Sequence, residues 1–135
     1  MSGVSKAIVQ PLLSWYDAGP RDLPWRSEPA PYRVWVSEIM LQQTRVEAVR
    51  GYFSRWMNAL PDIPALAAAD EVVYTKLWEG LGYYSRVRNL HRAAVLLCEE
   101  YGGELPADYD RLLALPGVGE YTAGAVASIA FGLPV

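Results

Sequence analysis

The sequence contains one carboxylate whose neighbours favour acid–base chemistry, Glu38, in the run Ser37-Glu38-Ile39-Met40-Leu41-Gln42-Gln43-Thr44. Helical spacings of three and four residues place it on one face with Val34, Trp35, Leu41 and Gln42. Removal from water disfavours the charged form, so we expect a raised pKa and an acid that can donate a proton near neutrality. A partly exposed glutamate beside an apolar stripe fits the same pattern.

A second segment offers backbone groups rather than side chains. The run Leu115-Pro116-Gly117-Val118-Gly119-Glu120-Tyr121-Thr122-Ala123 predicts two short helices joined by a tight turn, in which glycines can take positive φ. The second helix would present unpaired N–H groups and the positive end of its dipole between Gly119 and Tyr121, which suits a phosphate. The small residues after Tyr121 favour close helix packing, whereas an ordinary glycine-capped turn is the alternative.

The elements that must position these groups are all expected to be helices. Apolar periodicity is helical along nearly the whole chain, and no segment alternates polar and apolar residues as a strand does. We therefore predict an all-α fold in a single domain over residues 1–135, with the hairpin at about 108–132. Expected helices contain residues 12–16, 32–41, 46–56, 71–78, 87–101, 108–115 and 120–131, and the proline-rich residues 24–31 form a connector. Thr44-Arg45-Val46-Glu47 is predicted as a capping box, after a polar turn at Gln42-Gln43.

The charge and cysteine content exclude some classes of function. The net charge is −3, with ten arginines but only Lys6 and Lys76 as lysines, which excludes binding of nucleic acid by bulk positive charge alone. The single cysteine, Cys98, cannot form an internal disulfide or a metal site by itself, so we expect no metal in this chain. The sequence also contains no apolar stretch long enough for a membrane span and no signal-peptide pattern. We therefore expect a cytoplasmic protein without membrane contact.

Three runs and the hairpin resemble a known family in their order along the chain. Leu23-Pro24-Trp25-Arg26, the run around Glu38, and Gly80-Leu81-Gly82-Tyr83-Tyr84 are together similar to adenine DNA glycosylases of the MutY type. These belong to the helix-hairpin-helix, endonuclease III superfamily. The resemblance extends from about Trp15 to Phe131. It implies an endonuclease III-like helix-hairpin-helix fold and a base-excision-repair enzyme that hydrolyses the N-glycosidic bond of adenine paired with 8-oxoguanine or guanine in duplex DNA.

The resemblance also implies a role for particular residues. Glu38 would protonate the flipped adenine and then handle the attacking water, and Tyr121 would lie beside the reacting sugar. Tyr83 would be the wedge that fills the kinked duplex, although a core tyrosine after a glycine turn is the alternative. Trp25 and Arg26 would line the adenine pocket; Leu41, Gln42, Gln43 and Thr44 would contact the lesion strand; and Gly117, Val118, Gly119, Tyr121 and Thr122 would hold a phosphate.

Tyr121 bears on one of the three hypotheses for this chain, that of a strand-cleaving enzyme. Strand-cleaving members of the superfamily carry a nucleophilic lysine two residues beyond the second hairpin glycine, where this chain has Tyr121. The resemblance therefore implies base removal by water without strand cleavage. A strand-cleaving relative that acts on oxidised pyrimidines is disfavoured by Tyr121 and Gln42-Gln43. A non-catalytic helix-hairpin-helix DNA-binding module remains as the alternative function.

Several family features are not present in the 135 residues. The family uses an aspartate soon after the second hairpin helix, four cysteines that hold a [4Fe–4S] cluster, and a C-terminal domain that helps to recognise 8-oxoguanine. We therefore expect a fold that is incomplete at its C-terminus, with no cofactor bound by this chain and weak or no activity of these residues alone. We also expect self-association or low stability, because apolar faces in residues 1–20 would be left uncovered.

Overall fold

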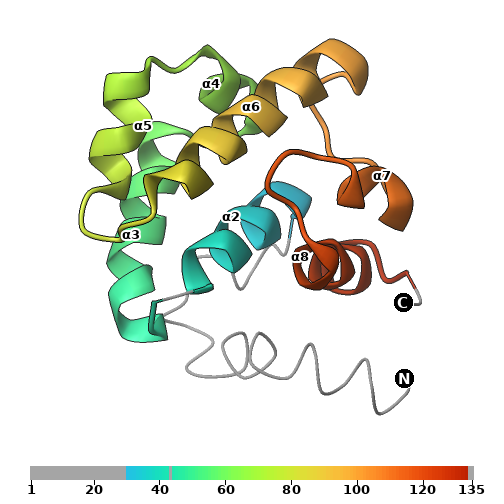
Figure 1. Cartoon of the computed structure of the whole chain (residues 1–135), viewed down its shortest axis with the longest axis horizontal. Coiled ribbons are helices and arrows are strands. Elements are labelled where there is room, and N and C mark those ends of the chain that lie inside the picture. Colours follow the sequence, from blue (N-terminus) through green and yellow to red (C-terminus); the bar gives the residue numbers. More distant parts are fainter. Residues whose placement is uncertain (1–29, 43, 134–135) are drawn as a thin grey trace.

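A computed structural model describes residues 30–42 and 44–133, and every regular element in these ranges is a helix (Figure 1). The prediction of an all-α fold is confirmed. The expected helix through residues 12–16 and the connector up to residue 29 lie outside the described residues. The elements are α2 (Pro31–Leu41), α3 (Val46–Ala59), α4 (Ile63–Ala68), α5 (Glu71–Trp78), α6 (Tyr84–Glu100), α7 (Tyr109–Leu113), α8 (Glu120–Ala125) and a π-helical turn, η1 (Val126–Ala130).

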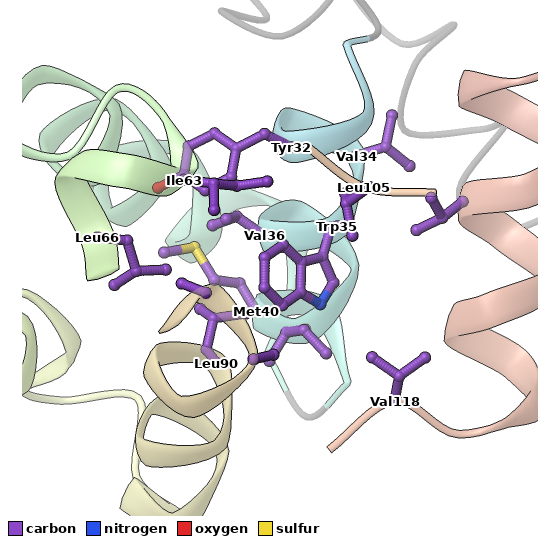
Figure 2. Packing of buried hydrophobic residues seen from close by; sticks show 14 of the residues in the cluster. Tyr32, Val34, Trp35, Val36, Met40, Ile63, Leu66, Leu90, Leu105 and Val118 are labelled. Atoms are coloured by element: carbon purple, nitrogen blue, oxygen red, sulfur yellow. The ribbon is translucent and has the colours of Figure 1, made fainter. Parts of the chain in front are cut away.

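Helix α2 lies at the centre of the described structure, between the group formed by α3 to α6 and the pair α7 and α8 (Figure 1). Eight of its 11 residues are buried, so it is covered on nearly all sides rather than along one stripe. In Figure 2, Trp35 and Met40 of α2 lie among side chains from other elements. The labelled core residues from other elements are Ile63, Leu66, Leu90, Leu105 and Val118.

Two polar side chains of this core, Tyr32 and Trp56, are paired across helices. The Tyr32 hydroxyl donates to the Leu60 carbonyl at 2.7 Å and accepts a hydrogen bond from Trp56 Nε1 at 2.9 Å. The Trp56 ring then meets the Trp78 ring edge to face, with 5.7 Å between centroids. Because a buried polar group without a partner costs free energy, these bonds fix how α2, α3 and α5 meet.

The start of α3 and the presence of α4 differ from the prediction. The prediction of a capping box at Thr44 is wrong: α3 begins at Val46, its N-cap is Arg45, and no side chain among the described residues caps it. A short helix that was not predicted, α4, follows α3 because Asp62 Oδ1 accepts a hydrogen bond from the Ala65 N–H at 2.9 Å. Pro64 interrupts the apolar pattern in the sequence, but proline is tolerated in the first turn of a helix, where its missing N–H has no intrahelical partner.

Candidate active site

Glu38 is a buried ionisable side chain in the last turns of the central helix. Only 3% of it is exposed, and its neighbour Ser37 is fully buried with its hydroxyl donating to the Val34 carbonyl at 2.8 Å. One carboxyl oxygen of Glu38, Oε2, is buried without a hydrogen-bond partner among the described residues. An unpartnered buried carboxyl oxygen is costly when charged, and this favours the protonated acid.

The partner of Glu38 comes from the first turn of α8, where the Tyr121 side chain forms a hydrogen bond with the Glu38 carboxyl group. Burial raises the pKa of Glu38 from 4.5 to about 7, even though the bond from Tyr121 lowers it. Burial, and next the negative charge of Glu38, raise the pKa of Tyr121 to about 12. The tyrosine therefore stays protonated and donates, while the carboxyl group titrates near neutral pH. The expected rise of the Glu38 pKa is confirmed.

Glu38 and Tyr121 line a cavity of about 720 Å³ between the end of α2 and the start of α3. This volume lies within the range of about 300–1,000 Å³ typical of small-molecule sites, so a base-sized group fits beside the acid. The other lining residues of the described chain are Leu41, Gln42, Thr44, Arg45, Val46 and Glu47. Sequence reasoning missed the last three, whose only signal was that they follow the polar turn directly.

The polar turn after α2 also connects to the hairpin. Gln42 is exposed, and its Nε2 donates to the buried Thr122 Oγ1 of α8 at 3.3 Å. Predicted lesion-strand residues Leu41, Gln42 and Thr44 thus lie on the same cavity as Glu38. Gln43 and the predicted adenine-pocket residues Trp25 and Arg26 lie outside the described residues.

The hairpin is a tight turn between α7 and α8. The Val118 N–H donates to the Leu115 carbonyl at 3.1 Å, and Gly117 has φ +76°, the conformation that this turn requires after Pro116. A Cβ at Gly117 would lie 2.7 Å from the Asn89 Cβ, so the turn packs directly against α6. Gly119 is the N-cap of α8, and no side chain of the described residues caps this helix. The predicted hairpin turn is therefore present.

Tyr83 is the most exposed aromatic residue in the described part of the chain, with 63% of its surface accessible. It is the N-cap of α6 and has left-handed backbone angles, φ 53° and ψ 61°. Left-handed geometry is costly for a residue with a Cβ, and such strain is commonly found at functional positions. The alternative of a core tyrosine is excluded. Tyr83 is not among the residues that line the cavity of Glu38.

The described residues contain no other obvious chemical centre. In residues 30–42 and 44–133, no three His, Cys, Asp or Glu side chains are grouped closely enough to hold a metal ion. None of the helices in the same ranges is both long and apolar enough to cross a membrane.

Known structures of similar fold contain the same arrangement of helices. A structure described as a thermostable thymine-DNA glycosylase superposes with a TM-score of 0.76 and 29% identity, over 95% of this chain and 59% of that one. A trapped endonuclease III–DNA covalent intermediate gives a TM-score of 0.75 with 26% identity, over 96% of this chain and 58% of that one. The predicted endonuclease III-like fold is confirmed.

Sequence relatives include several adenine DNA glycosylases. The protein of Mus musculus is 52% identical over 129 residues, which are 89% of this chain and 25% of that protein. The protein of Mycolicibacterium smegmatis is 46% identical over 121 residues, which are 89% of this chain and 41% of that protein. The chain therefore spans about a quarter to two-fifths of the length of these curated relatives.

The family match covers the candidate site itself. Residues 36–128 match the family described as HhH-GPD superfamily base excision DNA repair protein. This range contains Glu38, Tyr83, the hairpin and Tyr121. The chain belongs to the HhH-GPD superfamily of base excision DNA repair proteins.

Proposed function

We propose that this chain is the acid-bearing part of a DNA glycosylase that removes adenine by hydrolysis. The observation that carries the proposal is Glu38, which is buried, has a pKa of about 7, and faces a cavity of about 720 Å³. A carboxyl group with this pKa is partly protonated at neutral pH, as a general acid must be. The adenine DNA glycosylases among the relatives support adenine as the base.

In the proposed reaction, Glu38 donates its proton to a ring nitrogen of the flipped adenine. The bond between that base and the sugar then breaks, its electron pair leaves with the base, and the sugar develops oxocarbenium character. A water molecule adds to the sugar carbon and returns a proton to the Glu38 carboxylate. The hydrogen bond from Tyr121 stabilises that carboxylate and orients it between the two proton transfers.

We propose that the reaction stops at base removal. A strand-cleaving mechanism needs an amine that attacks the sugar, and Tyr121 stands at the hairpin position where the strand-cleaving relatives carry a lysine. Lys76, the only lysine within residues 30–42 and 44–133, is exposed on α5 and does not line the cavity. The hydroxyl of Tyr121 stays protonated because its pKa is raised to about 12, so it makes a poor nucleophile.

The proposed substrate is duplex DNA with adenine opposite 8-oxoguanine or guanine. We assign the hairpin, with Gly117, Val118, Gly119, Tyr121 and Thr122, to a backbone phosphate, because its N–H groups and helix dipole favour an anion. We assign Tyr83 as the wedge, since it is exposed and fixed in a strained turn. Leu41, Gln42, Gln43 and Thr44 would face the lesion strand, and Trp25 and Arg26 would line the adenine pocket.

The [4Fe–4S] cluster of the family does not fit these residues. Such a cluster needs four cysteine ligands, whereas the chain contains only Cys98, which is exposed on α6. We therefore propose that this chain holds no [4Fe–4S] cluster by itself. We also place the protein in the cytoplasm, together with the chromosome on which it would act.

The test is adenine release from a duplex with adenine opposite 8-oxoguanine, measured under single-turnover conditions with the protein at its full natural length. We expect release by the parent protein, and Glu38→Gln should abolish release while duplex binding is retained. Glu99→Gln, on the exposed side of α6, is the matched control and should release adenine at the parent rate. Binding without adenine release by the parent protein would instead favour the non-catalytic DNA-binding module.

A second comparison tests the partner base. Duplexes with adenine opposite 8-oxoguanine, guanine or thymine should differ in rate, with thymine the slowest. Equal rates on all three would contradict the assignment of Leu41, Gln42, Gln43 and Thr44 to the lesion strand, while leaving the acid assignment intact.

A further inference from the structure

Arg86, in the first turn of α6, contacts two segments of the site at once. Its Nη1 donates to the Ile39 carbonyl of α2 at 2.7 Å, and its Nη2 is 3.4 Å from the carbonyls of both Leu81 and Gly82. One side chain therefore joins the helix that carries Glu38 to the turn that precedes Tyr83. No role was assigned to Arg86 from the sequence.

The bond to α2 is made next to the candidate acid. Ile39 follows Glu38 directly, and its carbonyl also accepts from the Gln42 N–H at 3.3 Å where the helix ends. The last turn of α2 contains no basic residue of its own. Since cations favour the negative end of a helix dipole, the guanidinium of Arg86 supplies from α6 the charge that α2 lacks at this end.

The guanidinium also fixes the strained turn. It lies 5.5 Å from the centroid of the Trp78 ring and 5.6 Å from that of the Tyr83 ring, within the range of cation–π contact with both. Trp78 is fully buried and its Nε1 donates to the Gly82 carbonyl at 3.1 Å, so one face of the arrangement is part of the core. The exposed Tyr83 ring therefore contacts the Arg86 guanidinium, which also contacts the buried Trp78 ring.

A third segment lies nearby. Arg86 lines a small cavity of about 30 Å³ together with Trp35, Asn89 and Gly117. Gly117 is the hairpin glycine that packs against Asn89. Helix α2, the turn that precedes Tyr83, and the hairpin between α7 and α8 therefore meet around Arg86.

We propose that Arg86 is a positioning residue that fixes the turn carrying Tyr83 relative to the end of α2, so that insertion of the Tyr83 ring into DNA places the extruded base at Glu38. The catalytic consequence rests on the function proposed above. The effect of Arg86 on the turn before Tyr83 is independent of that function. Lysine should replace Arg86 only in part, because a single ammonium group cannot bond the Ile39 carbonyl and the turn carbonyls in the same planar fork.

The first experiment needs no DNA. Hydrogen exchange of the backbone amides in residues 80–86 is compared among the parent protein, Arg86→Met, Arg86→Lys and Arg88→Met. Arg88 is the matched control because it is an exposed arginine on the same helix, 3.5 Å from Glu71. We expect faster exchange for Arg86→Met, an intermediate rate for Arg86→Lys, and no change for Arg88→Met. Unchanged exchange in both Arg86 variants would overturn the proposal.

The second experiment is a double-mutant cycle with Tyr83→Ala. Base extrusion is followed by the fluorescence of 2-aminopurine at the target position, and base release is measured at saturating protein. Arg86→Lys should slow extrusion about tenfold in the parent background, within the usual size of couplings between contacting residues, and have little further effect in Tyr83→Ala. Additive rate losses from Arg86→Lys and Tyr83→Ala would overturn the proposed coupling between Arg86 and Tyr83. If Arg86→Met does not fold, Arg86→Lys alone completes both experiments.

The dependence of base release on pH distinguishes a positioning role of Arg86 from an electrostatic effect of Arg86 on Glu38. Burial, opposed by the hydrogen bond from Tyr121, accounts for the raised pKa of Glu38, so a purely positioning role of Arg86 predicts the same midpoint of the pH profile in Arg86→Lys and the parent. A shifted midpoint would show that Arg86 acts on the acid itself and would overturn a positioning role. If Glu38→Gln proves harmless while exchange near Tyr83 responds to Arg86, the proposed function fails and the structural coupling stands.

Discussion

The carboxyl group of Glu38 and the side chain of Tyr121 share a hydrogen bond that joins the central helix α2 to the first turn after the hairpin. Glu38 is buried, whereas Tyr121 is 39% exposed, and both residues line the cavity. The bond opposes the effect of burial on Glu38 and leaves its pKa at about 7 instead of higher. The acid is therefore close to half protonated in neutral solution.

The pH dependence of adenine release should report this carboxyl group. Because the protonated form is the proposed acid, the rate should fall as the pH rises through about 7. Tyr121→Phe removes a bond that stabilises the carboxylate, so the midpoint should move to higher pH. Single-turnover rates between pH 5 and 9 measure both midpoints. Tyr84→Phe, outside the cavity, is the control, and a downward shift in Tyr121→Phe would contradict the assignment.

The stability of the protein should also depend on pH through Glu38. Its pKa is raised on folding, so the folded state holds the proton more tightly, and stability is lost as the pH rises from 4.5 through about 7. The loss amounts to roughly 3 kcal/mol above this window. Glu38→Gln should remove this loss and be the more stable protein at pH 8. Urea unfolding at pH 4.5 and 8 measures the difference; equal pH dependence in both proteins would be inconsistent with a buried acid.

The two hairpin glycines should behave differently. Gly117→Ala places a Cβ 2.7 Å from the Asn89 Cβ at a φ of +76°, so we expect a loss of about 1–3 kcal/mol in the free energy of unfolding. Gly119 has φ −95° and open space around its Cβ position, so Gly119→Ala should cost less than about 1 kcal/mol. Thermal denaturation measures both effects.

Duplex binding adds a test of the phosphate assignment at the same position. If the backbone at Gly119 approaches a phosphate closely, Gly119→Ala should weaken binding although the fold is retained. Fluorescence anisotropy with a labelled duplex measures the affinity. Parent-like affinity of Gly119→Ala would argue that the hairpin does not contact DNA there.

Tyr83 should matter for activity more than for stability. Asparagine tolerates left-handed backbone angles better than tyrosine does, so Tyr83→Asn relieves strain while it loses the contact with Arg86. We expect the free energy of unfolding to change by less than about 1 kcal/mol. Adenine release should nevertheless fall at least about tenfold if the ring is the wedge. Tyr84→Asn is the control at the next position, and an equal loss in both variants would contradict the assignment.

Local signals in the sequence were sufficient for the helices with clear ends. The helix predicted over residues 71–78 is α5, and the polar turn predicted at Gln42 follows α2. Helix α7 lies within the predicted residues 108–115 and is capped by Asp108, whose carboxylate accepts from the Arg111 N–H at 3.0 Å. Local patterns wrongly predicted a capping box at Thr44, and they did not predict α4. A cap forms only when the chain arrives at the helix in the right direction, and the packing of α3 decides that direction.

The sequence by itself determined the class of fold, the hairpin and the identity of the candidate acid, because periodicity, glycine positions and family motifs are properties of short segments. It placed Glu38 on an apolar stripe, which is compatible with exposure. Only the tertiary structure decided that α2 is covered on nearly all sides, that Tyr121 reaches the carboxyl group, and that Arg86 joins Ile39 to the turn of Tyr83. The physical reason is that burial and pairing depend on groups brought together from distant parts of the chain, and a pattern within one helix cannot specify them.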